Sequence, residues 1–173
     1  VAAPLILGVQ AHREGDPAAV DVHRGAVDFV ECVGVLVVVR VEWRGQPVFV
    51  VRRTEDQLAT LVGGEDALKD PQSVNSKQPE YVDQINRAVK SEFLVLVGLC
   101  THLGCSPKYI KKLDSAAPTE DWNGGFFCAC HGSRFDIAGR VFKGVPASEN
   151  LVVPPYSYES DTVMIIGIDE EKA

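Results

Sequence analysis

Two short motifs dominate this sequence, Cys100-Thr101-His102-Leu103-Gly104-Cys105 and Cys128-Ala129-Cys130-His131-Gly132-Ser133. Each motif brings two cysteines and one histidine together within a few residues. The pair therefore offers more candidate ligands than a single four-coordinate metal can use. The repeated pattern predicts two loops that converge on one metal centre, with the rest of the chain as their scaffold.

Other uses of these residues are possible from the pattern alone. Cysteine and histidine also bind zinc well, so a structural zinc site is one alternative. Zinc sites usually space their ligands as Cys-x2-Cys and His-x3-His, whereas here a Cys-x-His pair is combined with a Cys-x2-His pair. A set of purely structural disulfides is another alternative, but it leaves two histidines at matched positions without a role.

The two motifs resemble those of the Rieske iron–sulfur protein of respiratory quinol–cytochrome c reductase. The resemblance continues in the Gly-x-Pro-Ala run at 144–147 and covers most of the chain, from about residue 41 to residue 155. It implies one 2Fe–2S cluster with two cysteines on one iron and two histidines on the other, namely Cys100, Cys128, His102 and His131. It also implies a disulfide between Cys105 and Cys130.

The resemblance implies further roles around these ligands. His102 and His131 are expected to couple electron transfer to proton transfer and to contact quinol. Ser133 and Phe135 are expected to tune the cluster, although many members of the family have tyrosine where this chain has Phe135. A docking tip and a cover loop are expected at four further positions, which are Leu103, Gly104, Gly144 and Pro146.

By this resemblance the chain is an electron-transfer subunit of quinol–cytochrome c reductase, a proton-translocating oxidoreductase. Its cluster would take an electron, with a proton, from ubiquinol at cytochrome b and pass the electron to a c-type cytochrome. A disulfide needs an oxidising compartment. In a bacterium the head domain should therefore face the periplasm. The resemblance further implies a dimeric complex in the bacterial inner membrane.

Two alternative functions use the same kind of cluster. One is the Rieske small subunit of a periplasmic oxidase such as arsenite oxidase, which shares the additional cysteine pair. The other is a soluble Rieske ferredoxin, a class that lacks this pair. Cys105 and Cys130 therefore argue against the ferredoxin.

The composition is that of an ordinary globular domain, with 173 residues, 46% hydrophobic and 24% charged. The formal net charge of −7 and the lack of a basic run exclude a nucleic-acid-binding function. Of the five cysteines, Cys32 lies outside both motifs. We expect it to be a small buried hydrophobic residue in a strand.

The apolar run at 1–9 is too short to span a bilayer, which takes about 20 residues. We expect residues 1–19 to be the end of an N-terminal membrane anchor followed by a flexible tether. Residues 20–173 then form the Rieske domain, with a cluster-binding subdomain at about 99–145.

The remaining pattern predicts an all-β fold. Residues 20–51 are strand-like, with a hairpin turn at Arg44-Gly45-Gln46, and further strands are expected at 93–97, 151–153 and 162–168. A second hairpin should turn near Gly139. Short helices are expected at 54–62 and 81–89. The predicted architecture is an antiparallel Rieske-type β-sandwich base domain with an inserted cluster-binding subdomain and a short helix or two.

The motifs lead to a direct chemical prediction. The purified protein should contain two irons and two acid-labile sulfides per chain, because the resemblance assigns four ligands to one 2Fe–2S cluster. Elemental analysis and sulfide determination on the same sample measure both contents. Stoichiometric zinc without iron would contradict the prediction.

Overall fold

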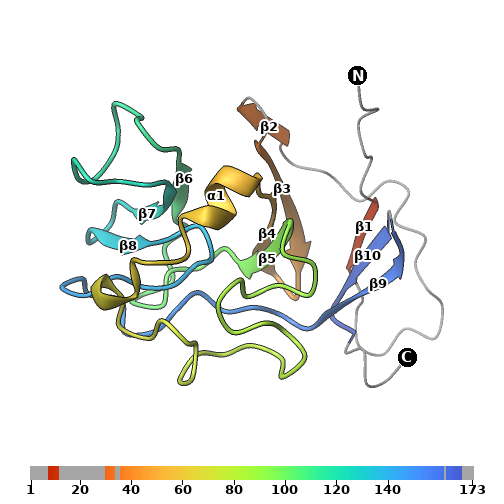
Figure 1. The fold of residues 1–173 in the computed structure, drawn as a ribbon. Coiled ribbons are helices and arrows are strands. Elements are labelled where there is room, and N and C mark those ends of the chain that lie inside the picture. Colours follow the sequence, from red (N-terminus) through yellow and green to blue (C-terminus); the bar gives the residue numbers. More distant parts are fainter. Residues whose placement is uncertain (1–7, 12–29, 34–35, 162, 169–173) are drawn as a thin grey trace.

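The computed structural model describes residues 8–11, 30–33, 36–161 and 163–168, and it describes side-chain burial from residue 40 onward. Within these residues the elements are short strands, one α-helix and one 3-10 helix. The strands form three small sheets, which Figure 1 shows in order along the molecule. The predicted all-β class is therefore confirmed.

The central sheet has four strands in the order β2-β3-β4-β5. Their bounds are Val30–Val33, Leu36–Trp43, Gln46–Arg52 and Phe93–Val97. Each strand pairs antiparallel with its neighbour. The β3–β4 hairpin turns at Arg44 and Gly45, both with positive φ, as tight hairpin turns require. The predicted hairpin and the predicted strand at 93–97 are confirmed.

A second sheet has three strands in the order β1-β10-β9, with bounds Gly8–Ala11, Val163–Ile166 and Tyr156–Ser160. β9 and β10 form an antiparallel hairpin, whereas β1 pairs with β10 in parallel. This parallel pair departs from the antiparallel expectation. β1 also falls within residues 1–19, where an anchor and a tether were expected, and the remainder of that range lies outside the described residues.

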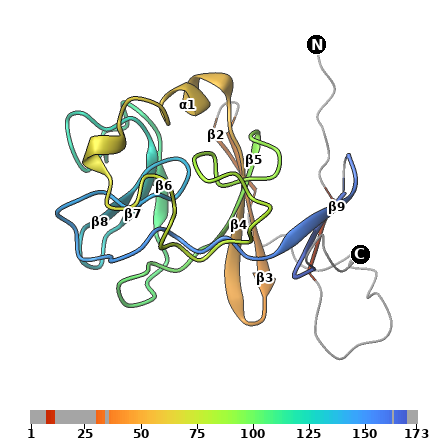
Figure 2. The ribbon, with the colours of Figure 1, turned by 60° about the horizontal axis from the view of Figure 1, so that its bottom comes forward.

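The third sheet, β6-β7-β8, comes from the expected cluster-binding subdomain. Its strands span Lys108–Ile110, Gly125–Cys128 and Ser133–Phe135. Figures 1 and 2 place it on the opposite side of the central sheet from β1-β10-β9. One hydrophobic core runs through all three sheets, and the Phe49 and Phe126 rings stack across it at 6.1 Å. The third sheet is therefore packed on the base rather than separate from it.

The first predicted helix is present but short. Helix α1 spans Glu55–Ala59 and begins with a capping box, in which Thr54 and Gln57 each bond the other's backbone amide. The 3-10 helix η1 spans Glu65–Ala67. None of the helices in the described part of the chain is long and apolar enough to cross a membrane.

The second predicted helix, at 81–89, is wrong. The Asp83 carboxylate accepts the backbone amides of Ile85 and Asn86, which favours a turn instead of a helix. Arg87 then has a φ of 55°, a left-handed conformation that no α-helix contains. The segment is therefore a series of turns.

The predicted strand at 151–153 is also absent. Val152 accepts a hydrogen bond from Val97, but Val153 donates to Lys77, so the extended segment alternates between two partners instead of forming one ladder. The predicted hairpin near Gly139 is confirmed by a bridge between Phe135 and Val141. Cys32 lies in β2 as expected, whereas its burial lies outside the described side chains.

Gly125, at the start of β7, is a sharp test of how tightly the third sheet is packed. Its φ is 148°, and an added Cβ would meet the Phe135 carbonyl oxygen and lie 2.9 Å from the Asp136 backbone. We expect Gly125→Ala to lower the free energy of unfolding by at least about 2 kcal/mol, through overpacking and backbone strain.

The measurement is urea unfolding of the holoprotein. Gly64→Ala is the matched control, because Gly64 has a φ of −114° and no heavy atom lies within 4 Å of its added Cβ. Equal stabilities for the two variants would show that the start of β7 is not under this constraint.

Candidate metal centre

The first motif forms a tight loop directly after β5. That strand is buried along its whole length, so it fixes the position from which the loop begins. The Gly104 amide donates to the Cys100 carbonyl at 2.9 Å, and the Cys100 amide donates to the Cys105 carbonyl at 2.8 Å. Gly104 has a φ of 80°, which favours glycine at this position.

The second motif forms a similar loop between β7 and β8. The Gly132 amide donates to the Cys128 carbonyl at 2.9 Å, and Gly132 has a φ of 77°. In both loops a glycine four residues after a cysteine therefore closes the turn on that cysteine. Cys128 is paired in register with Ser133 across the β7–β8 hairpin. The hairpin thus holds the two ends of the second loop next to each other.

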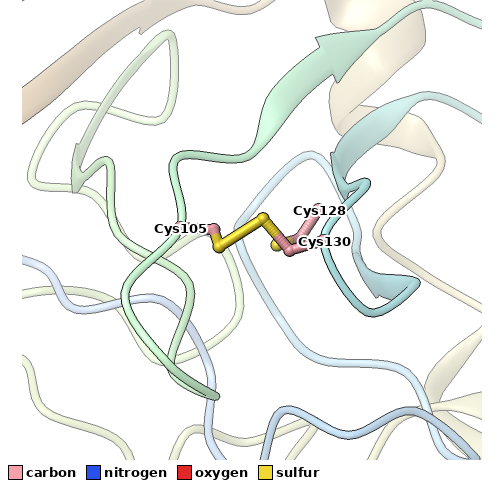
Figure 3. A group of neighbouring side chains, drawn as sticks. All are labelled: Cys105, Cys128 and Cys130. Carbon is pink, nitrogen blue, oxygen red and sulfur yellow. A yellow bond between two sulfur atoms is a disulfide. The ribbon is translucent and has the colours of Figure 1, made fainter.

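The four motif cysteines divide into two pairs. Cys105 and Cys130 are joined by a disulfide that links the two loops, as Figure 3 shows. Cys100 and Cys128 are free thiols, 4% and 1% exposed respectively. The disulfide matches the pairing that the resemblance implied. It leaves the two buried thiols as the sulfur ligands available to a metal.

The sulfur atoms lie close together in this structure. The Sγ atoms of Cys105, Cys128 and Cys130 are all within 4.8 Å of one another (Figure 3). Because two of these three sulfurs share a disulfide bond, the group is not itself a metal-ligand set. It shows instead that the disulfide lies directly beside the Cys128 thiol.

Burial raises the pKa of the Cys128 thiol, and its interaction with the Cys100 thiol raises that pKa further. Two thiolates side by side in a buried site would repel each other. Binding of a metal cation reverses this preference, since a coordinating thiol is deprotonated outright. The chemistry of the pair therefore suits a cationic metal centre.

The two motif histidines lie next to each other. The rings of His102 and His131 approach edge to face, with centroids 4.7 Å apart. The Nδ1 atom of His102 is buried and has no hydrogen-bond partner among the described residues. A buried polar atom without a partner is costly, and metal coordination is one way to satisfy it. His131 is exposed.

The residues present therefore fit a cluster with mixed sulfur and nitrogen ligation. Two free thiols come from the two loops, and two imidazoles come from the same loops. An unpartnered ring nitrogen and a raised thiol pKa are the features that such a cluster would resolve.

A third loop, residues 144–149, lies against the first two, and we call it the cover loop. The Ala147 amide donates to Ser133 Oγ at 3.0 Å, and Thr101 Oγ1 donates to the Glu149 carbonyl at 2.6 Å. Ser133 is completely buried. The cover loop is thus hydrogen-bonded to both motifs.

The tip of the centre is exposed, while its inner side is closed. Leu103 is 70% exposed, and the next residue of the first motif, Gly104, is exposed as well, as are Gly144 and Pro146 in the cover loop. Phe135, in contrast, is completely buried in β8 and has no hydroxyl group to offer the site. The structure therefore places the predicted tip and cover residues at the surface and the predicted tuning residues Ser133 and Phe135 inside.

Two residues near the centre were not singled out from the sequence. Thr101 lies inside the first motif, between two proposed ligands, so the sequence alone could have indicated a role for it at the centre. Lys69 is distant in sequence, and its side chain donates to the carbonyls of Val145 and Ala147 in the cover loop. Nothing in the local pattern around Lys69 indicates this contact.

Comparison with known proteins gives a consistent result. The family described as "Rieske [2Fe-2S] domain" matches residues 16–157. The chain is 50% identical over 134 residues to "Ubiquinol-cytochrome c reductase iron-sulfur subunit" of Allochromatium vinosum, covering 78% of this chain and 65% of that protein.

Two other relatives carry similar names. "Ubiquinol-cytochrome c reductase iron-sulfur subunit" of Rhodospirillum rubrum is 43% identical over 130 residues, covering 75% of this chain and 63% of that protein. "Cytochrome b-c1 complex subunit Rieske-1, mitochondrial" of Arabidopsis thaliana is 45% identical over 133 residues, covering 75% of this chain and 40% of that protein. The chain thus spans less than two thirds of the length of each relative.

The inter-loop disulfide leads to a prediction about stability. It closes a loop with a sequence separation of 25 residues and holds the two motif loops together. We expect the double variant Cys105→Ala/Cys130→Ala to lose about 2–5 kcal/mol of unfolding free energy, the usual effect of removing a native disulfide. Urea unfolding and iron release from the holoprotein measure the loss.

The control is Cys32→Ala, which removes the cysteine that lies outside both motifs. A double variant that unfolds and releases iron like this control would contradict the assigned structural role.

Proposed function

This chain belongs to the Rieske [2Fe–2S] domain family, and from that membership we propose that it is the electron-transfer subunit of a membrane-bound quinol–cytochrome c reductase. The observation that carries the proposal is the pair of disulfide-linked loops, each with one buried free thiol and one histidine. The names of the curated relatives support the same activity.

The proposed cluster ligands are Cys100 and Cys128 on one iron and His102 and His131 on the other. Burial of the two thiols supports their assignment as metal ligands, since a thiolate away from water needs a cation beside it. The adjacent rings of His102 and His131 support the assignment of the two histidines as a pair to the other iron. The unpartnered Nδ1 of His102 is the atom we propose for coordination.

When bound, a cluster of this type exchanges one electron at about −150 to +300 mV, well above all-thiolate plant-type clusters. The residues of this chain account for the remaining requirements. Each imidazole that binds a metal through one ring nitrogen keeps a second ring nitrogen for proton exchange. His102 and His131 thereby provide the proton acceptor that quinol oxidation needs.

The docking tip is proposed to consist of the exposed residues around the two histidines. Leu103 offers an apolar side chain to a partner. The exposed residues Gly104, Gly144 and Pro146 have no long side chain that would obstruct the partner's approach. We propose cytochrome b as the partner at which ubiquinol is oxidised and a c-type cytochrome as the electron acceptor. An exposed leucine next to the half-buried His102, in a loop that lies against the exposed His131, is consistent with such a transient apolar contact.

The proposed location is a bacterial inner membrane, with the head on the periplasmic side, in a dimeric complex. An inter-loop disulfide supports an oxidising compartment. Membrane attachment is proposed through an N-terminal anchor.

The proposal is tested with the full-length protein in its native membrane. We expect mild detergent extraction to copurify it with b-type and c-type haem, and the preparation to reduce cytochrome c with ubiquinol. Copurification with an oxidase and no b-type haem would favour the oxidase subunit instead. Recovery as a haem-free soluble protein would overturn the proposal.

A pair of variants sharpens the test. Leu103→Asp should reduce quinol–cytochrome c reductase activity at least tenfold, which is about 1.4 kcal/mol of transition-state stabilisation, without loss of iron. Leu113→Asp is the matched control, because Leu113 is 89% exposed and lies in the segment between β6 and β7. Equal activities for the two variants would show that the tip does not dock.

A further inference from the structure

Lys69 makes two contacts that connect the base of the molecule to the cover loop. Its Nζ atom donates to the Val145 carbonyl at 2.8 Å and to the Ala147 carbonyl at 2.6 Å. Its backbone amide also donates to the Val141 carbonyl at 3.0 Å. Hydrogen bonds from a charged donor are roughly twice as strong as those between neutral groups.

The positive charge of Lys69 is directed at the loop and not at a carboxylate. Among the described residues, no acidic side chain forms an ion pair with it. The neighbouring Asp70 carboxylate instead accepts the amides of Val74 and Asn75 and the hydroxyl of Ser76. The ammonium group of Lys69 therefore has the two loop carbonyls as its hydrogen-bond acceptors.

These two carbonyls lie on either side of one functional peptide bond. The peptide between Pro146 and Ala147 supplies the amide that donates to Ser133 Oγ at 3.0 Å. Pro146 has no amide hydrogen, so the Ala147 amide is the first backbone donor after Val145 in this loop. Lys69 fixes the peptide before this amide and the peptide after it, and thereby fixes the amide's direction.

The orientation of Ser133 follows from this amide. A hydroxyl group has one hydrogen to donate and two lone pairs that accept. Since one lone pair of the buried Ser133 oxygen is occupied by Ala147, the hydroxyl hydrogen is free to point elsewhere. Ser133 follows the proposed ligand His131 by two residues. Its hydroxyl group is therefore close in sequence to the residues proposed to hold the cluster.

We propose that Lys69 is a positioning residue for the cluster: through the cover loop it orients the Ser133 hydroxyl, and so favours the reduced, more negative state. This inference rests on the cluster-binding function proposed above. A hydroxyl donor stabilises a more negative acceptor more strongly. Loss of its orientation therefore lowers the midpoint potential.

Lys143 provides a matched control. It directly precedes the cover loop and carries the same charge, but its Nζ atom donates to the Asp66 carbonyl at 2.8 Å in the base. Lys143→Met therefore removes one positive charge from the same neighbourhood without releasing the carbonyls of Val145 and Ala147.

The experiment compares redox titrations of the isolated holoprotein and its variants at one pH, with the electron paramagnetic resonance spectrum of the reduced cluster. We expect Lys69→Met to weaken electron affinity about threefold to tenfold, which corresponds to about 28 to 59 mV for one electron. Lys69→Arg, which retains a charged donor, should restore most of the potential. Lys143→Met should shift it much less.

The route through Ser133 is tested by a double variant. If Lys69 acts by orienting the hydroxyl, Lys69→Met should have little effect on the potential in a Ser133→Ala background. A full shift in that background would overturn the proposal, and so would equal shifts for Lys69→Met and Lys143→Met. Should Lys69→Met fail to assemble, Lys69→Gln takes its place, because it is too short to hold both carbonyls, and an unchanged potential would also overturn the proposal.

Failure of this inference is distinguishable from failure of the proposed function. Iron and sulfide content of the unmodified protein establishes the cluster first, and copurification with haem tests the partners separately. The titrations use the isolated holoprotein, so they need the cluster but neither cytochrome. If the protein binds the cluster but lacks those partners, the redox titrations still decide the role of Lys69.

Discussion

Three buried arginines hold together the part of the molecule that lacks regular secondary structure. Between α1 and β5 the chain contains only the short η1, so its backbone carbonyls cannot find partners within a sheet or helix. Arg87, a completely buried residue of this segment, donates to the carbonyls of Ala138, Gly139 and Leu151, which lie outside the segment and also belong to no strand. A buried carbonyl without a donor is costly, so these guanidinium groups replace the missing ladder.

The other two arginines extend the same arrangement. Arg53 donates to the carbonyls of Asn86 and Ser91 on the irregular segment. Arg140 donates to the Leu61 and Pro71 carbonyls and to the Asp136 carboxylate. Burial lowers the pKa of both Arg53 and Arg87 to about 10, so both remain charged at neutral pH. The turn at 136–140 and the segment between α1 and β5 are thus hydrogen-bonded to one another in both directions.

The parts of the site that sequence predicts are the local ones. Each motif lies within six residues, and its closing glycine is determined by the turn itself, so candidate ligands can be recognised without knowing the fold. The strands at 46–52 and 93–97 were likewise predictable, because a run of apolar and β-branched residues needs burial. The turns at 81–89 were not, since one Asp83 side chain and one left-handed Arg87 override an apolar pattern.

What escaped prediction depends on side chains that reach backbone atoms distant in sequence. Lys69 contacts carbonyls 76 and 78 residues away, and Arg87 contacts a carbonyl 64 residues away. Lysine and arginine are ordinarily surface residues, so no local pattern distinguishes these from the others. Phe135 shows the opposite case: its position was predicted, but the structure shows it filling the core with no polar atom. The proposed tuning of the centre therefore relies on the Ser133 hydroxyl, which accepts a hydrogen bond from the Ala147 amide of the cover loop. Under the proposal made above for Lys69, long-range contacts from a side chain to backbone carbonyls would set the direction of this hydroxyl, just as the buried arginines hold the irregular segments in place.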